Sequence, residues 1–140
     1  MKLGFKSIQE ILSKHPQVLF SYLFGSFAKG KTHAASDLDI GVYVSENNEV
    51  KREALLDSIY NDLVKSKLPA SLDLVDLRKL PSHVSYEIVA KGQILMCRDE
   101  KERIEFSCRV LREYFDIEYY RQRYYKKMMD RIEGGRFGHL

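Results

Sequence analysis

The residues with the clearest chemical potential lie in the first third of the chain, within YLFGSFAKGKTHAASDLDIGVYV at positions 22–44. Asp37 and Asp39 stand two positions apart at the start of an apolar run, so strand alternation places both carboxylates on one face. Two neighbouring carboxylates repel each other unless a cation lies between them. The opposite face of this strand is apolar, and packing alone gives no reason for two acids here. We therefore interpret Asp37 and Asp39 as metal ligands, with Mg²⁺ as the hard cation that carboxylate oxygens suit.

A glycine–serine pair, Gly25 and Ser26, ends the preceding apolar run, and ten residues separate it from Asp37. Glycine permits a tight bend and the close approach of a ligand to the backbone. Free N–H groups at the start of a turn or short helix, expected at residues 27–29, attract phosphate oxygens, and the serine hydroxyl adds a donor. Taken alone, Ser26 fits an ordinary helix cap. Beside two acids, the pair favours a phosphate-binding turn.

Other side chains of the same loop leave two interpretations open. Lys29 would neutralise phosphate as a point charge, and Ser36 would donate to a phosphate or fix the turn. Both residue types are equally common at solvated loop positions. We keep Lys29 and Ser36 as candidate nucleotide-binding residues and expect His33 to be solvated.

The glycine–serine pair, the ten-residue spacing and the Asp-x-Asp pair, set between two expected strands, resemble the signature of the DNA polymerase β-type nucleotidyltransferases. GSFAKG and SDLDI are similar to segments of the minimal members of that superfamily. The short chain and its later DLVDL segment resemble the MntA-like minimal nucleotidyltransferases in particular. This resemblance implies a triphosphate held at Gly25 and Ser26 and a third carboxylate on a neighbouring strand. Lys29 departs from the family pattern, in which an arginine is frequent at this position.

Asp73 and Asp76 are the candidates for the third carboxylate, in the strand expected at residues 71–77. Because they are three positions apart they point to opposite faces, so only one can join Asp37 and Asp39. Asp73 lies in the middle of the apolar run, where an unpaired charge is costly. Asp76 lies near the strand end, where water or a turn can satisfy it. We choose Asp73 and keep Asp76 as the alternative.

The remaining pattern predicts the elements that position these residues. Apolar spacing indicates helices at residues 7–15, 47–67 and 83–91 and a long one at 101–132, and strands at 18–24, 37–44, 71–77 and 93–97. Ser7 with Glu10, and Asp99 with Glu102, fit capping boxes. We predict one α/β (α+β) domain over residues 1–140 with the nucleotidyltransferase fold. It would have a small mixed sheet, helices on one face and a long C-terminal helix.

The long helix has an unusual composition, because it holds five of the nine tyrosines and a basic cluster at residues 121–127. Tyrosine and arginine are enriched in protein interfaces, so we expect this helix to bind a partner protein. Binding of RNA through stacking and phosphate contacts is the alternative. Acidic residues before and after the basic cluster argue against RNA binding. The tyrosines are Tyr114, Tyr119, Tyr120, Tyr124 and Tyr125.

Composition narrows the class of protein further. The net charge of +3 is mild, Cys97 and Cys108 are too few for a disulfide framework, and no apolar run approaches the length of a membrane span. The N-terminus lacks the apolar core of a signal peptide. These features favour the cytoplasm, with no membrane contact and no direct nucleic-acid binding expected.

The functional hypothesis combines the residues with the resemblance. Asp37, Asp39 and Asp73 would hold two Mg²⁺ ions for nucleotidyl transfer. The resemblance implies ATP as the donor and a tyrosine of a HepT-like HEPN toxin ribonuclease as the acceptor. Both proteins would form a hetero-oligomer in which this chain is the antitoxin. The alternatives are a small-molecule nucleotidyltransferase of the aminoglycoside type and a non-catalytic antitoxin that acts by sequestration.

Overall fold

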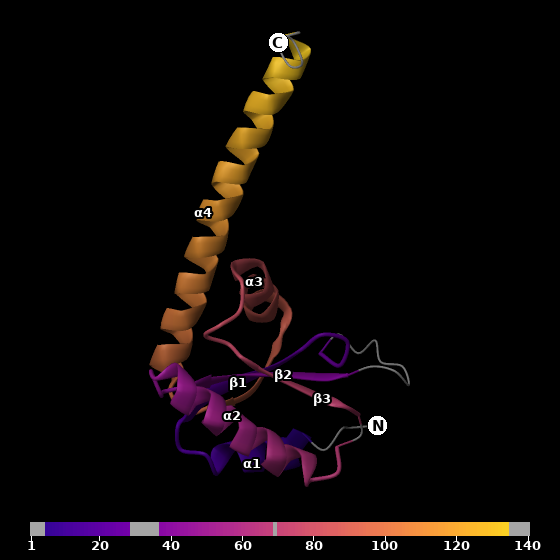
Figure 1. The fold of residues 1–140 in the computed structure, drawn as a ribbon, viewed down its shortest axis with the longest axis vertical. Helices are drawn as coiled ribbons and strands as arrows, with labels where there is room; N and C mark the ends of the chain where they lie inside the picture. Colours follow the sequence, from indigo (N-terminus) through magenta and orange to yellow (C-terminus); the bar gives the residue numbers. More distant parts are fainter. Residues whose placement is uncertain (1–4, 29–36, 69, 135–140) are drawn as a thin grey trace.

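The computed structural model in Figure 1 describes residues 5–28, 37–68 and 70–134. Every predicted element is present in the predicted order, and the bounds of β1 and β4 are those predicted. The element order is α1 (Phe5–Ser13), β1 (Val18–Phe24), β2 (Leu38–Val44), α2 (Glu49–Val64), β3 (Leu72–Asp76), α3 (Ser82–Lys91), β4 (Gln93–Cys97) and α4 (Glu100–Glu133).

The two predicted capping boxes have different outcomes. The Asp99 side chain accepts a hydrogen bond from the backbone N–H of Glu102, so it caps α4 as predicted. The prediction for Ser7 is wrong, because α1 begins at Phe5 and Ser7 lies inside the helix. A serine followed three positions later by glutamate also occurs within helices, and here the apolar side chain of Phe5, which packs on the core, extends the helix beyond that signal.

The four strands form one mixed sheet in the order β3-β2-β1-β4. β1 is antiparallel to both β2 and β4, whereas β2 and β3 are parallel and are joined through α2. The parallel register sets Asp39 beside Asp73. The mixed sheet and the long C-terminal helix confirm the predicted fold class.

Helices cover both faces of the sheet, so the prediction that they lie on one face is wrong. α1 and α2 pack on one face, while α3 and the first turns of α4 pack on the other (Figure 1). Along β1 and β2, Leu23 and Ile40 point to the α1/α2 core, and Phe20 and Tyr43 point to the α3/α4 core. The apolar run of β1 is continuous because this strand is buried on both sides.

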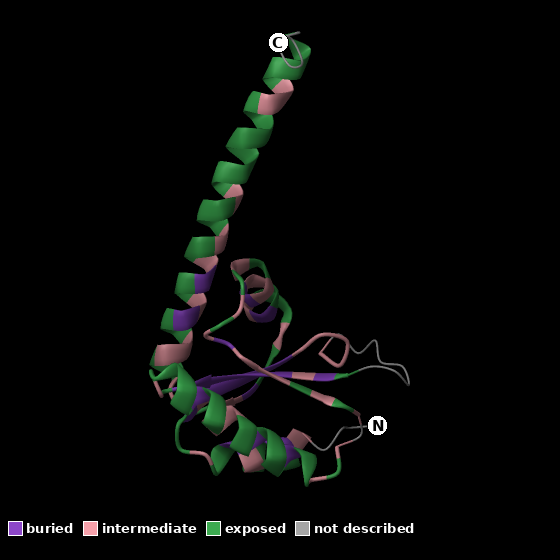
Figure 2. Cartoon of the chain, viewed as in Figure 1, coloured by how far each residue is buried: buried purple, intermediate pink, exposed green. Residues whose placement is uncertain are grey.

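α4 is anchored at its base and then leaves the body of the molecule. Phe106 and Val110 are buried in the α3/α4 core, and the ring of Tyr114 stacks on Tyr86 of α3 at a centroid distance of 3.8 Å. Beyond Tyr114 no described residue of the helix is buried, and the ribbon projects past the sheet (Figure 2). None of the helices in the described ranges is long and apolar enough to cross a membrane.

Candidate active site

Two carboxylates meet at the start of the parallel pair β2 and β3. Asp39 and Asp73 are register partners, and both belong to the sheet face that α3 and α4 cover in part. The pKa of Asp39 is raised, first by burial and then by the negative charges of Asp73 and Asp37, with a side-chain hydrogen bond to Asp73 adding to the effect. Asp73 is exposed and Asp39 is half-buried. The fold therefore holds like charges together at the open end of these strands.

The turn that follows β1 lies directly against this pair. Gly25 has a φ of +74°, in the left-handed region that favours glycine. A Cβ at Gly25 would collide with Oδ2 of Asp39. Ser26 follows in the same turn, which covers residues 25–28. The structure thus brings the predicted phosphate turn into contact with a predicted metal ligand, and only glycine fits at the contact.

The other predicted members of the site have different positions. Asp37 is exposed just ahead of β2, close enough to raise the pKa of Asp39. Lys29 and Ser36 lie outside the described residues, so their nucleotide-binding role stays a prediction, as does the end of the short helix expected at 27–29. His33 also lies outside the described residues.

The carboxylates beside the turn are candidates for a metal site. Within residues 5–28, 37–68 and 70–134, no three acidic, histidine or cysteine side chains converge closely enough to hold an ion. Over the same ranges, neither Asp39 nor Asp73 forms an ion pair with a basic side chain. Neighbouring carboxylates with hard oxygen donors and a raised pKa are a donor set that fits Mg²⁺.

Asp76, the alternative third carboxylate, is hydrogen-bonded by other parts of the chain and does not lie near Asp39. It lies on the opposite face of β3, as the spacing predicts, and its Oδ2 accepts a hydrogen bond from Nε of Arg52 at 2.5 Å. Both side chains are only 9% exposed, and Oδ1 of Asp76 accepts from the backbone N–H of Arg78 at 3.0 Å. The expectation that Asp73 lies in an apolar environment is therefore wrong, because its side chain is exposed. Asp76 is largely covered instead, and the following turn satisfies it through the N–H of Arg78, as expected.

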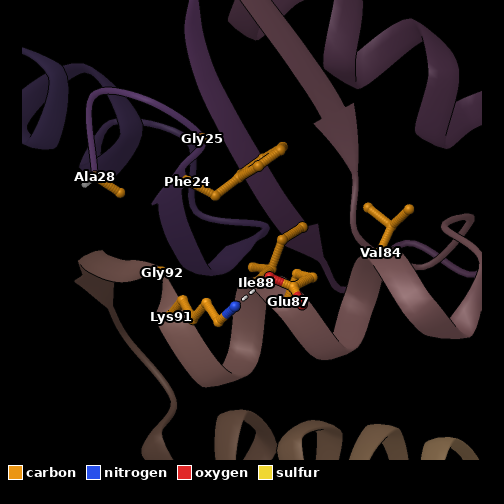
Figure 3. A pocket seen from close by; sticks show the side chains of 8 residues that line it. All are labelled: Phe24, Gly25, Ala28, Val84, Glu87, Ile88, Lys91 and Gly92. Carbon is orange, nitrogen blue, oxygen red and sulfur yellow. Dashed lines mark ion pairs between the residues drawn. The ribbon is translucent and has the colours of Figure 1, made fainter. Parts of the chain in front are cut away.

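A cavity of about 220 Å³ opens beside the turn, between the end of β1 and α3 (Figure 3). It lies on the α3/α4 side of the sheet, to which Asp39 and Asp73 also belong. One wall is the end of β1 with Gly25 and Ala28, and the other is α3 with its terminal Gly92. Side chains of α3 that line the cavity are Val84, Glu87, Ile88 and Lys91. Gly25 belongs both to the cavity wall and to the contact with Asp39.

Two supporting residues escaped the sequence analysis. Nε2 of Gln93, at the start of β4, donates to the backbone oxygen of Ala28 at 3.1 Å and ties the turn to the sheet edge. The buried hydroxyl of Ser21 donates to the backbone oxygen of Gly41 at 2.8 Å. Neither residue lies in a motif. The signal for Ser21 is a polar residue within a fully apolar strand, and Gln93 has no comparable signal.

A parallel βαβ pair with two acids at its open end and a glycine turn against them defines a nucleotidyltransferase domain. The chain belongs to the polymerase beta nucleotidyltransferase family, whose model matches residues 6–101. The family resemblance seen in the sequence is thereby confirmed.

Individual relatives narrow the likeness within the family. The protein adenylyltransferase MntA of Shewanella oneidensis is 27% identical over 118 residues, which cover 84% of this chain and 81% of that protein. A crystal structure of a toxin–antitoxin with AMP-PNP is 26% identical with a TM-score of 0.68, and the match covers 91% of this chain and 99% of that chain.

A further solved structure adds evidence for the fold alone. It contains a tri-AMPylated Shewanella oneidensis HEPN toxin in complex with an MNT antitoxin. The matched chain is 23% identical with a TM-score of 0.60, over 89% of this chain and 95% of that chain.

Proposed function

We propose that this chain is an antitoxin that transfers AMP from ATP to a tyrosine of a HEPN-family toxin. The observation that carries the proposal is the pairing of Asp39 with Asp73 beside the Gly25 turn. The likeness to protein adenylyltransferase MntA and to a toxin–antitoxin with AMP-PNP supports the nucleotide and the kind of partner. We propose that the chain acts as a single domain, residues 1–140, with α4 as its partner-binding element. A cytoplasmic location stays a prediction.

Asp37, Asp39 and Asp73 would hold two Mg²⁺ ions, because their oxygens are hard donors and their mutual repulsion needs a cation. When bound, Mg²⁺ supplies neutralisation of phosphate charge and a lower pKa for the acceptor hydroxyl. The pKa of Asp39 is raised first by burial and then by the charges of Asp73 and Asp37, and the second of these causes is the one that a bound cation would offset.

The protein's own groups have separate roles in the proposed reaction. Backbone N–H groups of the turn and the hydroxyl of Ser26 bind the phosphates that leave as pyrophosphate. The tyrosine oxygen attacks the α-phosphorus as the bond to the pyrophosphate oxygen breaks. Asp73 is exposed and accepts the tyrosine proton as the general base. Gly25 keeps the turn against Asp39, so the reacting phosphate is positioned near the carboxylates.

The projecting part of α4 is the surface we assign to the toxin. Ile117, Tyr120, Tyr124 and Met128 recur every three or four residues, so they share one side of the helix. Tyr120 and Tyr124 are 68% and 69% exposed. Large aromatic side chains that no part of the described chain covers are typical of the centre of a protein interface.

The reaction is tested with purified chain, labelled ATP, Mg²⁺ and the protein encoded by the adjacent gene. We expect label on a tyrosine of that protein, located by mass spectrometry, and loss of toxin activity. Asp39→Asn should abolish labelling, whereas Asp57→Asn, an exposed acid of α2 away from the site, should label normally. A tight complex without any transfer would reject the enzymatic proposal and leave sequestration as the mechanism.

The partner surface is tested separately by titration of the toxin onto the chain. Tyr120→Ala combined with Tyr124→Ala should weaken toxin binding by about tenfold or more. Gln122→Ala is the control, because Gln122 is exposed and lies about 200° around the helix from Tyr120. Equal affinities for all three proteins would show that this side of α4 is not the contact.

The competing function for the same site is AMP transfer to a small molecule. An aminoglycoside-type enzyme would transfer AMP to an antibiotic in the absence of any toxin. A panel of such acceptors, assayed under the same conditions, should remain unlabelled if the proposed function is correct.

A further inference from the structure

β3 is the outermost strand at one margin of the sheet, and one side of its backbone faces away from β2. The backbone oxygen of Ser71 and the backbone N–H of Leu77, on either side of the strand, both bond to β2. Because backbone groups alternate in direction along a strand, the N–H and C=O groups of Leu72 and Leu74 point outward. Among the described residues, no hydrogen bond uses these four groups. We call this row of groups the β3 edge.

β4, the outermost strand at the other margin, is protected from a further strand. The backbone oxygen of Leu95 accepts a hydrogen bond from Nε2 of Gln9 of α1 at 2.7 Å, and the register of β4 with β1 is irregular. Irregular pairing and covered backbone groups keep foreign strands from an edge. β3 instead pairs with β2 in an unbroken register, and none of its residues is buried (Figure 2). The β3 edge is therefore the margin that can accept an added strand.

Two hollows lie along the β3 edge, beside α2. The Leu72 hollow, of about 270 Å³, is also lined by Tyr60 and Val64. The Leu74 hollow, of about 310 Å³, is also lined by Tyr60 and Leu56. Leu72 and Leu74 both pack on the α1/α2 core and are one strand repeat apart, about 6.6 Å at 3.3 Å per residue. Strand addition takes its specificity from pockets for alternate side chains, and the two hollows have this spacing.

Asp73 lies between Leu72 and Leu74 and belongs to the opposite face of the sheet, beside Asp39. An added strand with alternate side chains in the two hollows presents the residue between them next to Asp73. In an antiparallel pair the two Cβ atoms are roughly 4.5–5.5 Å apart. We infer that the β3 edge binds an extended segment of the acceptor protein as an additional strand, with the target tyrosine opposite Asp73. The inference rests on the proposed function, because it takes Asp73 as the group that accepts the tyrosine proton.

The lining of the hollows describes the segment that fits. Most residues that line the Leu72 hollow are apolar, so the segment has an apolar residue on one side of its tyrosine. The lining of the Leu74 hollow includes Glu53 and Asp57 with one base, Lys79, so a long basic side chain suits the other side. Exposed charge pairs contribute little, so the backbone bonds and the shape of the hollows dominate. The isosteric change Asp57→Asn therefore leaves docking nearly unchanged.

A second copy of this chain fits the β3 edge less well than such a segment. The antiparallel pairing that uses the outward groups of both Leu72 and Leu74 would set Asp73 directly opposite its own copy. Like charges that face each other across paired strands destabilise the pair. A tyrosine opposite Asp73 avoids this repulsion and supplies a hydroxyl donor instead. The charges therefore favour a partner of different sequence.

The decisive measurement is amide hydrogen exchange by NMR on the full chain, with and without the protein encoded by the adjacent gene. In the free chain, the N–H groups of Asp73 and Val75 face β2 and exchange slowly, whereas those of Leu72 and Leu74 exchange rapidly. Binding of an added strand should slow the exchange of Leu72 and Leu74 by at least about tenfold. Asp73 and Val75 are the internal control, and a partner bound through α4 alone would change none of these amides.

Val64→Trp tests the Leu72 hollow, because Val64 is 48% exposed and a larger side chain fills the space. The KM for the acceptor should rise by at least about tenfold, while kcat and the affinity for ATP, measured by calorimetry with Mg²⁺, stay unchanged. Val50→Trp is the matched control, because Val50 is 76% exposed on α2 and lines neither hollow. Tyr60→Ala removes the wall that both hollows share from a 41% exposed position, and it should raise the KM if Val64→Trp does not fold.

The outcomes separate this inference from the proposed function. If AMP is transferred while Leu72 and Leu74 keep rapid exchange and the variants keep the normal KM, the β3 edge is not the acceptor site and the proposed function stands. If no AMP reaches the acceptor, the proposed function fails and the inference fails with it. If Leu72 and Leu74 are protected in the chain alone and lose protection on dilution, a second copy occupies the edge and the inference is wrong.

Discussion

The two ends of the parallel pair β2 and β3 differ in how their acidic side chains are paired. At the end near the turn, Asp39 and Asp73 lie side by side and, among the described residues, no basic side chain pairs with either. At the other end, Asp76 is buried with Arg52 and is also held by the N–H of Arg78. We call these the open end and the closed end of the pair.

The closed end is a connected network that fixes the shape of the sheet. Arg78 donates to the backbone oxygens of Val44 and Glu46 and to the side chain of Asn47, and Arg52 donates to Asp76. A buried charge that is paired inside the protein holds elements together, whereas acids that lie close together with a perturbed pKa are candidates for a ligand site. The difference in pairing is the reason why we propose a functional role for Asp39 and Asp73 and a structural one for Asp76.

The largest effect is expected at the closed end. Arg52→Ala would leave Asp76 buried without its cation, and breaking such a pair costs about 3–5 kcal/mol of folding free energy. Denaturant unfolding measures the loss. Arg112→Ala, at an exposed position of α4, should change stability by less than about 0.5 kcal/mol. Equal stability of both variants would contradict the structural role of the closed end.

A substitution at the open end should lower the transfer activity and leave the stability of the fold unchanged. Asp39→Asn removes one charge from the site and is expected to lower the rate of AMP transfer by at least about 100- to 1000-fold, because stabilisation of the reacting phosphate is lost. Thermal unfolding without Mg²⁺ should show a midpoint equal to or above that of the unaltered chain, since repulsion is relieved. A variant that unfolds readily would mean that Asp39 is a structural residue.

Asp73 and Asp76 give the sharpest comparison within a single strand. Asp73→Asn should alter the free energy of unfolding by less than about 0.5 kcal/mol, because its side chain is exposed. Asp76→Asn should be clearly destabilised, because Arg52 would lose its counter-charge in a buried position. Transfer activity, measured on the folded fraction, should be lost in the first variant and kept in the second. The reverse pattern would make Asp76 the third carboxylate.

The smallest effect is the pH dependence that Asp39 contributes. Its pKa in the folded, metal-free chain is raised above the usual value of 3.8. The folded state therefore binds the proton more tightly than the unfolded state, so this contribution to stability is present below the unfolded pKa and is lost as pH rises through the folded pKa.

The measurement compares the melting temperature of the unaltered chain with that of Asp39→Asn from about pH 3.5 to about pH 6.5. The variant should gain relative stability as pH rises, by less than about 1 kcal/mol because solvent screens a half-exposed group. A gain of relative stability towards low pH would contradict the raised pKa.

Much of the fold could be predicted because each element has a local signal. The apolar runs of β1 and β4 end at glycine and charged residues, and their bounds agree with the prediction. The placement of helices on both faces of the sheet could not be predicted, because a continuous apolar run does not indicate which helix packs on which face. The placement of α3 depends on the contact of Ile88 and Tyr86 with the sheet and α4, which only the folded chain shows.

The site shows the same limit at the level of single residues. The spacing of Gly25 to Asp39 indicated the chemistry, because a turn and a strand are local. The environment of Asp76 depends on Arg52, which lies 24 residues away on α2, and no periodicity pairs the two. The contact of Gly25 with Asp39 is also non-local, so the reason for glycine at this position became clear only from the fold.

The free part of α4 also sets the length of a contact surface that runs along it. From Tyr114 onward the helix runs for about twenty residues, or roughly 30 Å at 1.5 Å per residue. Under the proposed function, a toxin that contacts the far tip would lie roughly 30 Å along the helix from the body of this chain. An extended peptide needs about nine residues to cover that length, whereas a folded helical protein covers it with a single helix of about twenty residues.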